Sequence, residues 1–244
     1  MAAQARDVRP QTESFEVGIV RDKASIAEAQ RLRETMLVRE NDLRTPDERF
    51  EEHCDHLVAR DARSGRVVGA YRVLAPRDAR RAGGYRADRD FDLALLIVLR
   101  ERMVEIDRPC VDSAHPFESV VTHLWSALAR YLIENRFDYV FGTASVSLRD
   151  GGHAAASIHR MACARFISPE DYRVFPRRHL PIHSLSVTRP VSLPPLFRGY
   201  LDLGAWVCGE PALVAETGAA EFPILLPLAR MRGGDARDFL AKAT

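Results

Sequence analysis

The stretch VEIDRPCV, residues 104–111, decides how the surrounding chain folds. Its β-branched and apolar residues predict a strand, yet its middle carries Glu105, Asp107 and Arg108. Pro109 follows, and a proline cannot donate a hydrogen bond to a β-ladder. Ionisable side chains in mid-strand indicate a place where a sheet opens onto a cleft. Strict alternation puts Glu105 and Arg108 on opposite faces, and a β-bulge between them would turn both toward one site.

The spacing of these residues supports a purely structural interpretation equally well. Glu105 and Arg108 can form an ion pair near the edge of a sheet. A charged side chain is costly only when it is buried without a partner. An edge pair therefore needs no functional reason.

The segments around this strand alternate between strand and helix patterns. Strands are predicted at 15–20, 137–146 and 221–231, a hairpin at 55–76, and helices at 26–39 and after His115–Pro116. Such an order predicts an α/β fold, with a mixed central sheet flanked by helices.

Two local features refine this prediction. Ser25 and Glu28 have the spacing of a capping box at the start of the first helix. The apolar run LALLIVLRERM, residues 93–103, fits a helix or a strand equally well.

The domain organisation follows from length and composition. The chain has 244 residues, enough for one large domain. We expect a disordered tail over residues 1–14, a core over 15–190, and a C-terminal extension over 191–244 that packs on the core. The extension is rich in proline and glycine but too apolar to remain in solvent.

Composition argues against several classes of protein. The net charge of +1 gives no sign of a nucleic-acid binder. The four cysteines have no CxxC spacing, which argues against a zinc site or a disulfide framework and suits the reducing cytoplasm. No apolar run approaches the roughly 20 residues that span a bilayer. We expect a soluble cytoplasmic protein, with contact at the inner face of the membrane left open.

The usual catalytic and cofactor motifs are absent from the sequence. It has no G-x-S-x-G elbow, P-loop or G-x-G-x-x-G. The histidine pairs at 153 and 159 and at 179 and 183 are interpreted as loop residues, so no metal is expected. Cys110, next to Arg108, is more simply a buried thiol than a nucleophile.

Arginines form two clusters that could attract an acidic partner. Arg77, Arg80 and Arg81 make one, and Arg177 and Arg178 make the other. Solvated surface is the alternative for both.

Five stretches together resemble a known family. These are EIDRPCV (105–111), HLWSALARYL (123–132), FDYVFGTAS (137–145), LPPLFRGYLDLGAWVCGEPA (193–212) and AAEFPILLPLARM (219–231). They are similar to the N-acyltransferases that make ornithine lipids, a hemolysin-like branch of the GNAT superfamily akin in fold to acyl-homoserine lactone synthases. The resemblance covers about 16–240, and its C-terminal block is the most specific part. It implies a GNAT-like acyl-CoA N-acyltransferase fold.

The resemblance implies transfer of a 3-hydroxyacyl group from acyl carrier protein to the α-amino group of ornithine, giving lyso-ornithine lipid. Glu105 would accept the amine proton, and Arg108 would position Glu105 or the substrate carboxylate. The remaining assignments are substrate binding by Asp55, Arg72, Cys110, Trp125, Arg198 and Glu210, and carrier-protein docking by Arg177 and Arg178.

The donor implied is the acyl-phosphopantetheine of the carrier protein, with no permanently bound cofactor. In GNAT folds a helix N-terminus holds the coenzyme A pyrophosphate, but here the turn DSAHPFES (112–119) lacks glycine and contains Asp112 and Glu118. The chain also departs from the family pattern at Asp107 and Pro109, where glycine and serine are usual. The alternatives are another acceptor amine, of the glycine or acyl-homoserine lactone type, or an inactive GNAT-like binding module.

Overall fold

The computed structural model describes residues 14–40, 48–187 and 191–231. Nearly all of the tail predicted at residues 1–14 lies outside these ranges. The strands of the main sheet are β1 (Phe15–Val20), β2 (Asp55–Asp61), β3 (Val67–Leu74), β5 (Met103–Val111), β6 (Tyr139–Ser147), β8 (Trp206–Val207), β9 (Ala212–Val214) and β10 (Ala219–Pro227). A small second sheet pairs β4 (Phe91–Asp92) with β7 (Phe175–Pro176).

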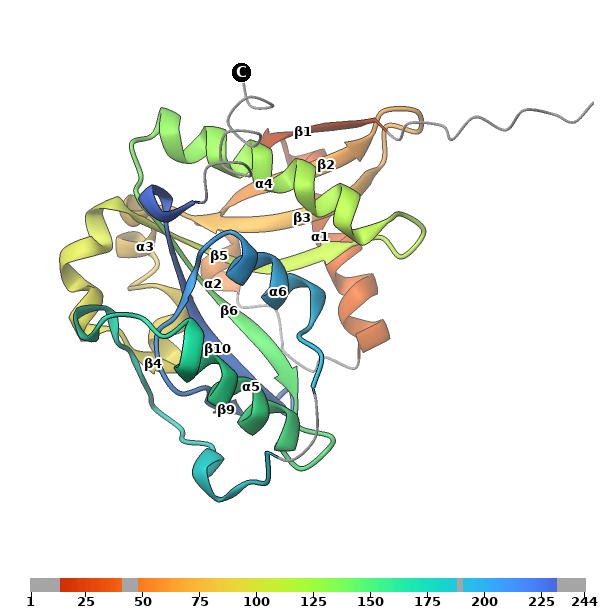
Figure 1. Ribbon diagram of the computed structural model, residues 1–244. Coiled ribbons are helices and arrows are strands. Elements are labelled where there is room, and N and C mark those ends of the chain that lie inside the picture. Colours follow the sequence, from red (N-terminus) through yellow and green to blue (C-terminus); the bar gives the residue numbers. More distant parts are fainter. Residues whose placement is uncertain (1–13, 41–47, 188–190, 232–244) are drawn as a thin grey trace, which may run out of the picture.

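Helices cover the main sheet and connect its strands (Figure 1). The α-helices are α1 (Lys23–Glu40), α2 (Glu48–Glu51), α3 (Pro76–Arg81), α4 (Phe117–Glu134), α5 (His153–Arg165) and α6 (Pro195–Asp202). The 3-10 helices are η1 (Arg86–Arg89), η2 (Ala94–Arg102), η3 (Glu170–Tyr172), η4 (Ile182–Ser184) and η5 (Leu228–Arg230).

The sheet is mixed, as the sequence predicts. Within the described residues its order is β1-β2-β3-β5-β6-β10-β8, and β9 pairs with β10. Neighbours are antiparallel except β5 and β6, which run parallel. The fold is therefore the α/β architecture expected from the sequence, a mixed central sheet flanked by helices.

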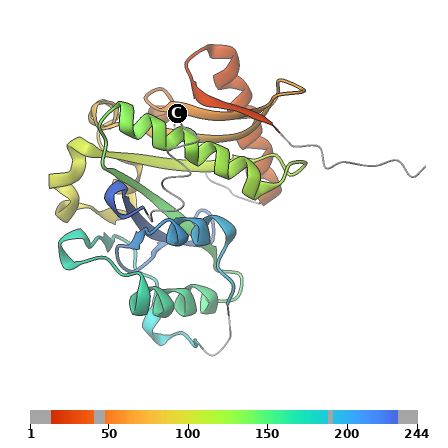
Figure 2. The same cartoon turned by 45° about the horizontal axis from the view of Figure 1, so that its top comes forward.

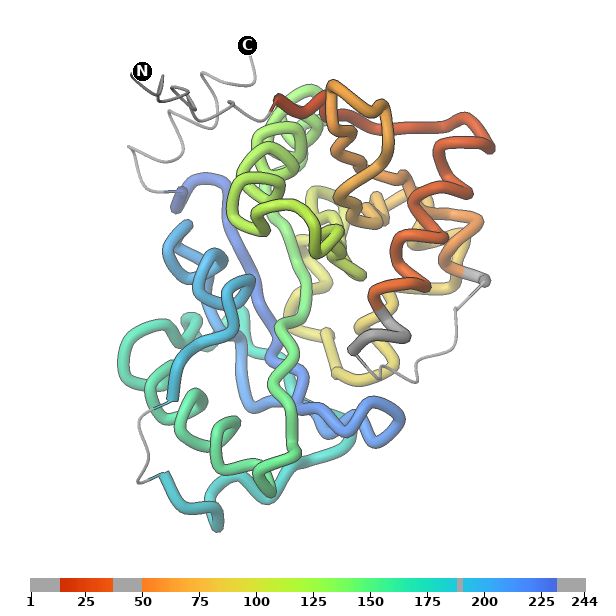
Figure 3. Tube along the Cα trace, turned by 90° about the vertical axis from the view of Figure 1, so that its right-hand side faces the viewer, coloured from red at the N-terminus to blue at the C-terminus, as the bar shows by residue number. Residues whose placement is uncertain are grey.

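The two faces of the sheet bury different helices. The apolar stripe of α4 (Val120, Leu124, Leu128 and Leu132) packs on Leu57 and Ala59 of β2. Val58, between them in sequence, packs with Ala29 of α1 on the other face. Strand alternation explains this separation. In Figure 3, α1 (red to orange, right) and α6 (blue, left) lie on opposite sides of β6 (green).

The C-terminal part supplies strands to the sheet as well as a covering helix. β10 pairs with β6 along its whole length, from Ala219–Ser147 to Pro227–Tyr139. Residues 191–231 thus contribute to the sheet itself instead of only packing on it, while the division expected near residue 190 stays a prediction. None of the described helices is both long and apolar enough to span a membrane.

Two local predictions need correction. The capping box is wrong, because Asp22 accepts the Ser25 amide at 2.8 Å while Glu28 accepts the distant Val67 amide at 2.9 Å. The pair His153 and His159 lies on helix α5 and not in a loop. An alanine-rich sequence there favours a helix, and the loop interpretation overlooked it.

Residues 93–103, for which the sequence left helix and strand open, are mostly helical. Ala94–Arg102 form the 3-10 helix η2, Leu93 precedes it, and Met103 begins β5. With three residues per turn, a 3-10 helix aligns every third side chain. Leu93, Leu96 and Leu99 accordingly form its buried side.

Candidate active site

The sheet parts beside the stretch that opened the sequence. The parallel ladder between β5 and β6 runs from Met103–Tyr139 to Glu105–Phe141, although both strands continue beyond it. On its other edge β5 stays paired with β3, but two residues of β5, Arg108 and Pro109, lie opposite the single residue Tyr71 of β3. This register shift is a β-bulge, but it begins at Arg108 and does not lie between Glu105 and Arg108, where the sequence predicted it.

Arg108 takes the extra position of the bulge. Its φ of 48° lies in the left-handed region, which is uncommon for a residue with a side chain. Strained backbone of this kind persists where the surrounding structure enforces it and gathers at functional sites. Pro109, which has no N–H to donate, follows directly.

A cavity of about 300 Å³ occupies the opening between β5 and β6. Its walls come from both faces of the sheet and from α6. The lining residues used below are Arg33, Arg86, Asp107, Arg108, Cys110, Phe117, Pro195, Leu196 and Tyr200. The cavity therefore passes through the sheet at the place where the strands separate.

Buried ion pairs form the wall on the α1 side. Arg72 of β3 is 1% exposed. It makes a bidentate pair with Asp107, with Nε at 2.7 Å from Oδ1 and Nη2 bonded to Oδ2, and its Nη1 donates to Glu51 at 2.7 Å. Arg86 donates from Nε to the same Asp107 at 2.9 Å. Burial alone would raise the pKa of Asp107, but Arg72 and Arg86 hold it well below its ordinary value.

The network continues through α1 and α2. Arg33 donates to Glu51 at 2.7 Å and lies 2.7 Å from His56 Nδ1. Burial opposes ionisation of Glu51, yet Arg33 and Arg72 bring its pKa down to about 2. Burial and the charge of Arg33 lower the pKa of His56. The side chain of His56 is therefore neutral near pH 7.

Glu105 lies behind this wall and is 4% exposed. Its Oε2 accepts the Arg86 amide at 2.6 Å, and its Oε1 accepts the Ala87 amide at 2.8 Å. Burial, together with the charge of Asp107, raises the pKa of Glu105 to about 7, although these hydrogen bonds act in the opposite direction. A carboxyl with such a pKa exchanges protons near neutral pH. The cavity is lined by Asp107 and not by Glu105, so the bulge does not turn Glu105 and Arg108 toward one site as the sequence led us to expect.

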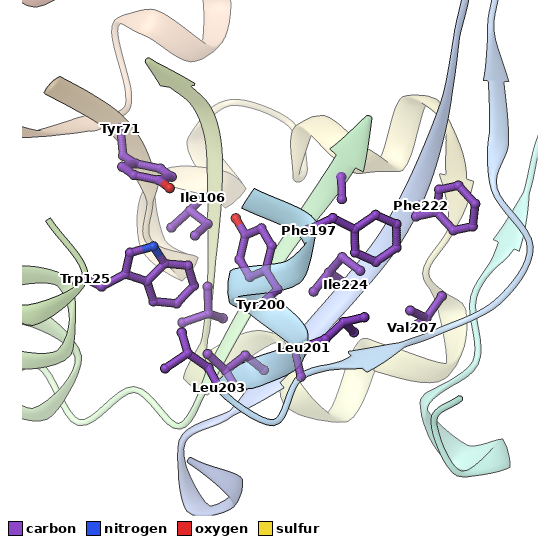
Figure 4. Packing of buried hydrophobic residues seen from close by; sticks show 14 of the residues in the cluster. Tyr71, Ile106, Trp125, Phe197, Tyr200, Leu201, Leu203, Val207, Phe222 and Ile224 are labelled. Atoms are coloured by element: carbon purple, nitrogen blue, oxygen red, sulfur yellow. The ribbon is translucent and has the colours of Figure 1, made fainter. Parts of the chain in front are cut away.

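Aromatic residues form the wall on the opposite side. The hydroxyl groups of Tyr71 and Tyr200 point toward Ile106 from two directions (Figure 4). The rings of Trp125 and Tyr200 meet edge to face, with centroids 5.0 Å apart. A Cβ atom at Gly142 would lie 3.0 Å from the Ile106 carbonyl oxygen and 3.5 Å from the Tyr200 hydroxyl oxygen. The absence of a side chain at Gly142 thus lets β5, β6 and Tyr200 lie close together where the strands separate.

A second hollow of about 390 Å³ adjoins the cavity between α4 and α6, and we call it the α4–α6 groove. Cavity and groove share Phe117, Pro195 and Leu196. The other groove residues are Glu118, Val121, Thr122, Trp125, Leu193, Arg198, Gly199, Asp202 and Leu203. The groove is mostly apolar and leads from the opening along the surface.

The structure brings together most of the residues assigned from the sequence. Arg108 and Cys110 line the cavity, and Arg72 lies in the ion-pair network behind it. Trp125 and Arg198 line the α4–α6 groove. The roles given to these residues remain predictions.

Besides Arg72 and Glu105, which lie behind the cavity wall, four assigned residues line neither hollow. Asp55 accepts the Tyr131 hydroxyl at 3.1 Å, and Glu210 accepts a hydrogen bond from His183 Nε2 at 2.8 Å. Arg177 donates from Nε to the Asp88 carbonyl at 2.9 Å. The fourth, Arg178, is an exposed residue near Glu216.

Sequence reasoning missed several residues of the site. Asp107 was noted as a mid-strand charge and as a departure from the family pattern but was given no role, and Arg86 was not assigned, because nothing local shows that they meet Arg72. Tyr200 lies in one of the stretches that resemble the family, and this resemblance was the only feature of the sequence that pointed to it. Among the residues that the structure describes, no three His, Cys, Asp or Glu side chains gather as a metal site would require.

Comparison with known proteins gives a consistent picture. A family model described as an acetyltransferase (GNAT) domain matches residues 26–126. The L-ornithine N(alpha)-acyltransferase of Rhodobacter capsulatus is 31% identical over 223 residues, which cover 82% of this chain and 85% of that protein. The protein of the same name from Brucella abortus is 28% identical over 242 residues, covering 89% and 86%.

One solved structure of similar fold is that of BjaI, a CoA-dependent acyl-homoserine lactone synthase. The TM-score is 0.53 at 14% identity, and the match covers 94% of this chain and 90% of that one. At this identity the likeness concerns the fold alone.

Replacing Asp107 with asparagine should destabilise the fold. The change leaves Arg72 and Arg86 buried with less negative charge, and removing one partner of a buried pair costs about 3 kcal/mol or more. Urea unfolding at pH 7 measures this loss. The control is Asp78→Asn, which breaks the surface pair with Arg81 and should cost less than about 1 kcal/mol. Equal losses in the two variants would show that Asp107 does not hold the network.

Proposed function

The chain belongs to the L-ornithine N(alpha)-acyltransferase family, and from this premise we propose that it moves a 3-hydroxyacyl group from acyl carrier protein to the α-amino group of ornithine. The enzyme is an acyltransferase with a GNAT domain. The product would be lyso-ornithine lipid. The observation that carries the proposal is the cavity through the sheet, with ion pairs on one side and an apolar groove on the other.

The acceptor amine would occupy the charged side of the cavity. Arg108 lines it and would bind the α-carboxylate of the amino acid, because a guanidinium suits bidentate carboxylate binding. Asp107 on the same wall is shared by Arg72 and Arg86, and we assign its charge to holding these two guanidinium groups and not to the substrate.

Transfer needs a proton acceptor and a stabilised oxyanion. The amine nitrogen attacks the thioester carbonyl carbon, the carbon–sulfur bond breaks, and the phosphopantetheine sulfur leaves as a thiolate that takes a proton from water. Glu105 would take the amine proton through a water molecule, since it does not line the cavity itself. Backbone N–H groups of β5 beyond Glu105, where the ladder with β6 has ended, would stabilise the developing negative charge.

The donor side suits a thioester without a nucleotide. Asp112 accepts the Ala114 amide at 3.0 Å in the turn before α4. The Asp112 carboxylate therefore already accepts from a backbone N–H that a pyrophosphate would need, and it adds negative charge in front of α4. The α4–α6 groove would hold the acyl chain, because it is apolar and continuous with the cavity through Phe117 and Leu196.

The direct test supplies purified enzyme with 3-hydroxyacyl carrier protein or the matching coenzyme A thioester, and with ornithine, glycine or S-adenosylmethionine. Mass spectrometry identifies the acylated amine. We expect N-acylornithine, formed mainly from the carrier-protein thioester. Acylation of glycine or formation of an acyl-homoserine lactone would assign another acceptor. A folded protein that acylates none of these amines would be a binding module.

The pH profile tests Glu105. A base with a pKa of about 7 works only when ionised, so kcat should rise with pH through about 7 and then level off. Glu105→Gln should lose this step and lower kcat roughly 100-fold or more. Glu105→Asp keeps a carboxylate and should retain a pH step at reduced kcat. If the glutamine variant kept the step, the proton would go elsewhere.

The variant Arg108→Gly tests the role of Arg108 in substrate binding separately from its effect on folding stability. Glycine tolerates the left-handed backbone of the bulge, so this variant should be stabilised by about 1 kcal/mol. It should nevertheless raise the KM for ornithine roughly tenfold or more, because a charged hydrogen bond is lost.

The matched control for that variant is Arg136→Gly, since Arg136 also has a positive φ, of 58°, but lies outside the cavity. It should gain similar stability and keep its KM. An unchanged KM in Arg108→Gly would remove Arg108 from the amine site.

A further inference from the structure

The 3-10 helix η2 exposes large apolar side chains that the fold does not use. Its three-residue period already supplies a buried side, made by Leu93, Leu96 and Leu99. The opposite side contains Leu95, Ile97 and Val98, exposed by 46%, 62% and 82%. We call these three residues the η2 outer face.

Single exposed apolar residues are common on protein surfaces. This face, however, has three exposed large apolar residues within the four positions 95–98. A solvated helix normally carries polar residues on its outer side. The aliphatic side chains of Ile97 and Val98 therefore indicate that this face contacts an apolar surface outside the protein.

Arginines flank the η2 outer face in the sequence. Residues 76–102 contain seven arginines and five carboxylates. Arg80 and Arg81 of α3 are exposed and pair with Glu101 and Asp78, while Arg102 ends η2 itself. Exposed ion pairs contribute little stability, so these guanidinium groups remain able to bind other anions.

This region lies at the periphery of the fold. α3 and η2, yellow in Figure 1, lie at one edge of the molecule, and Figure 2 shows the same segment projecting from the sheet. The η2 outer face is part of neither hollow described above. It therefore needs an occupant other than the substrates.

We propose that the η2 outer face inserts into an anionic lipid surface, with the neighbouring arginines binding lipid phosphates. Short amphipathic segments bind membranes by burying aliphatic side chains at the boundary between headgroups and acyl chains. Basic residues beside them add attraction to anionic lipid. A stable contact with another protein would instead need roughly 800 Å² per partner, usually with aromatic residues. Three aliphatic side chains at the periphery of the fold fit lipid better.

Vesicle binding tests this surface without acyl donor or amine, so its failure leaves the proposed reaction untouched. The full chain is sedimented with vesicles of phosphatidylcholine containing about one-third phosphatidylglycerol, and with phosphatidylcholine alone. We expect at least roughly tenfold tighter binding to the anionic vesicles, reduced by added salt. Val98→Asp and Ile97→Asp should each weaken that binding about tenfold or more.

The matched control is Ile133→Asp, on the last turn of α4. Ile133 is 47% exposed and lies outside the arginine-flanked segment. This variant should bind vesicles as the unchanged protein does, and thermal unfolding checks that all three aspartate variants are folded.

A fluorescent reporter gives a second readout. The emission of Val98→Trp, corrected for the two native tryptophans, should shift to shorter wavelength on anionic vesicles and be quenched by brominated lipid. Ile133→Trp should show neither change. The proposal is overturned if the protein does not bind vesicles, or if Val98→Asp binds as well as the unchanged protein. It is also overturned if the aspartate changes abolish only self-association or only carrier-protein binding.

Discussion

The pairing of Arg72 with Asp107 is the constraint on which the site depends. A guanidinium that is 1% exposed needs anionic partners, and Asp107 and Glu51 supply them. Asp107 can reach Arg72 only while β5 remains in register with β3. One residue later the bulge begins, and on its other edge β5 has already left β6. The ion pair therefore holds one side of the strand while the other side opens.

This arrangement gives the two faces of the opening different chemistry. The face toward α1 carries guanidinium and carboxylate groups that stay ionised, and behind them Glu105 has a pKa near neutrality. The face toward α4 and α6 carries aromatic and aliphatic side chains. A polar amine and a long acyl chain can thus meet at one point without sharing a binding surface. Because α6 belongs to the C-terminal block, the most specific part of the resemblance lies at the site and not at its periphery.

Local patterns in the sequence predicted the fold well. The charges and Pro109 within a strand predicted a bulge, although it begins at Arg108 and not before it, and helix α4 followed from its apolar stripe. Partners far apart in sequence were beyond reach. Arg72 and Asp107 are 35 positions apart, and only the register of two strands shows that they meet. Likewise the sequence left helix and strand open for η2, because its three-residue period matches neither an α-helix nor a strand.

The position of β10 has a consequence for synthesis on the ribosome. β6 pairs with β10 along nine residues, yet more than 70 residues separate Ser147 from Ala219. A nascent chain therefore emerges with one edge of β6 unpaired, and this edge is apolar and able to template intermolecular strands. Helix α6, which supplies Tyr200 to the cavity wall, is also synthesised late. Catalytic competence and protection from aggregation should thus arise together, in the last stage of translation.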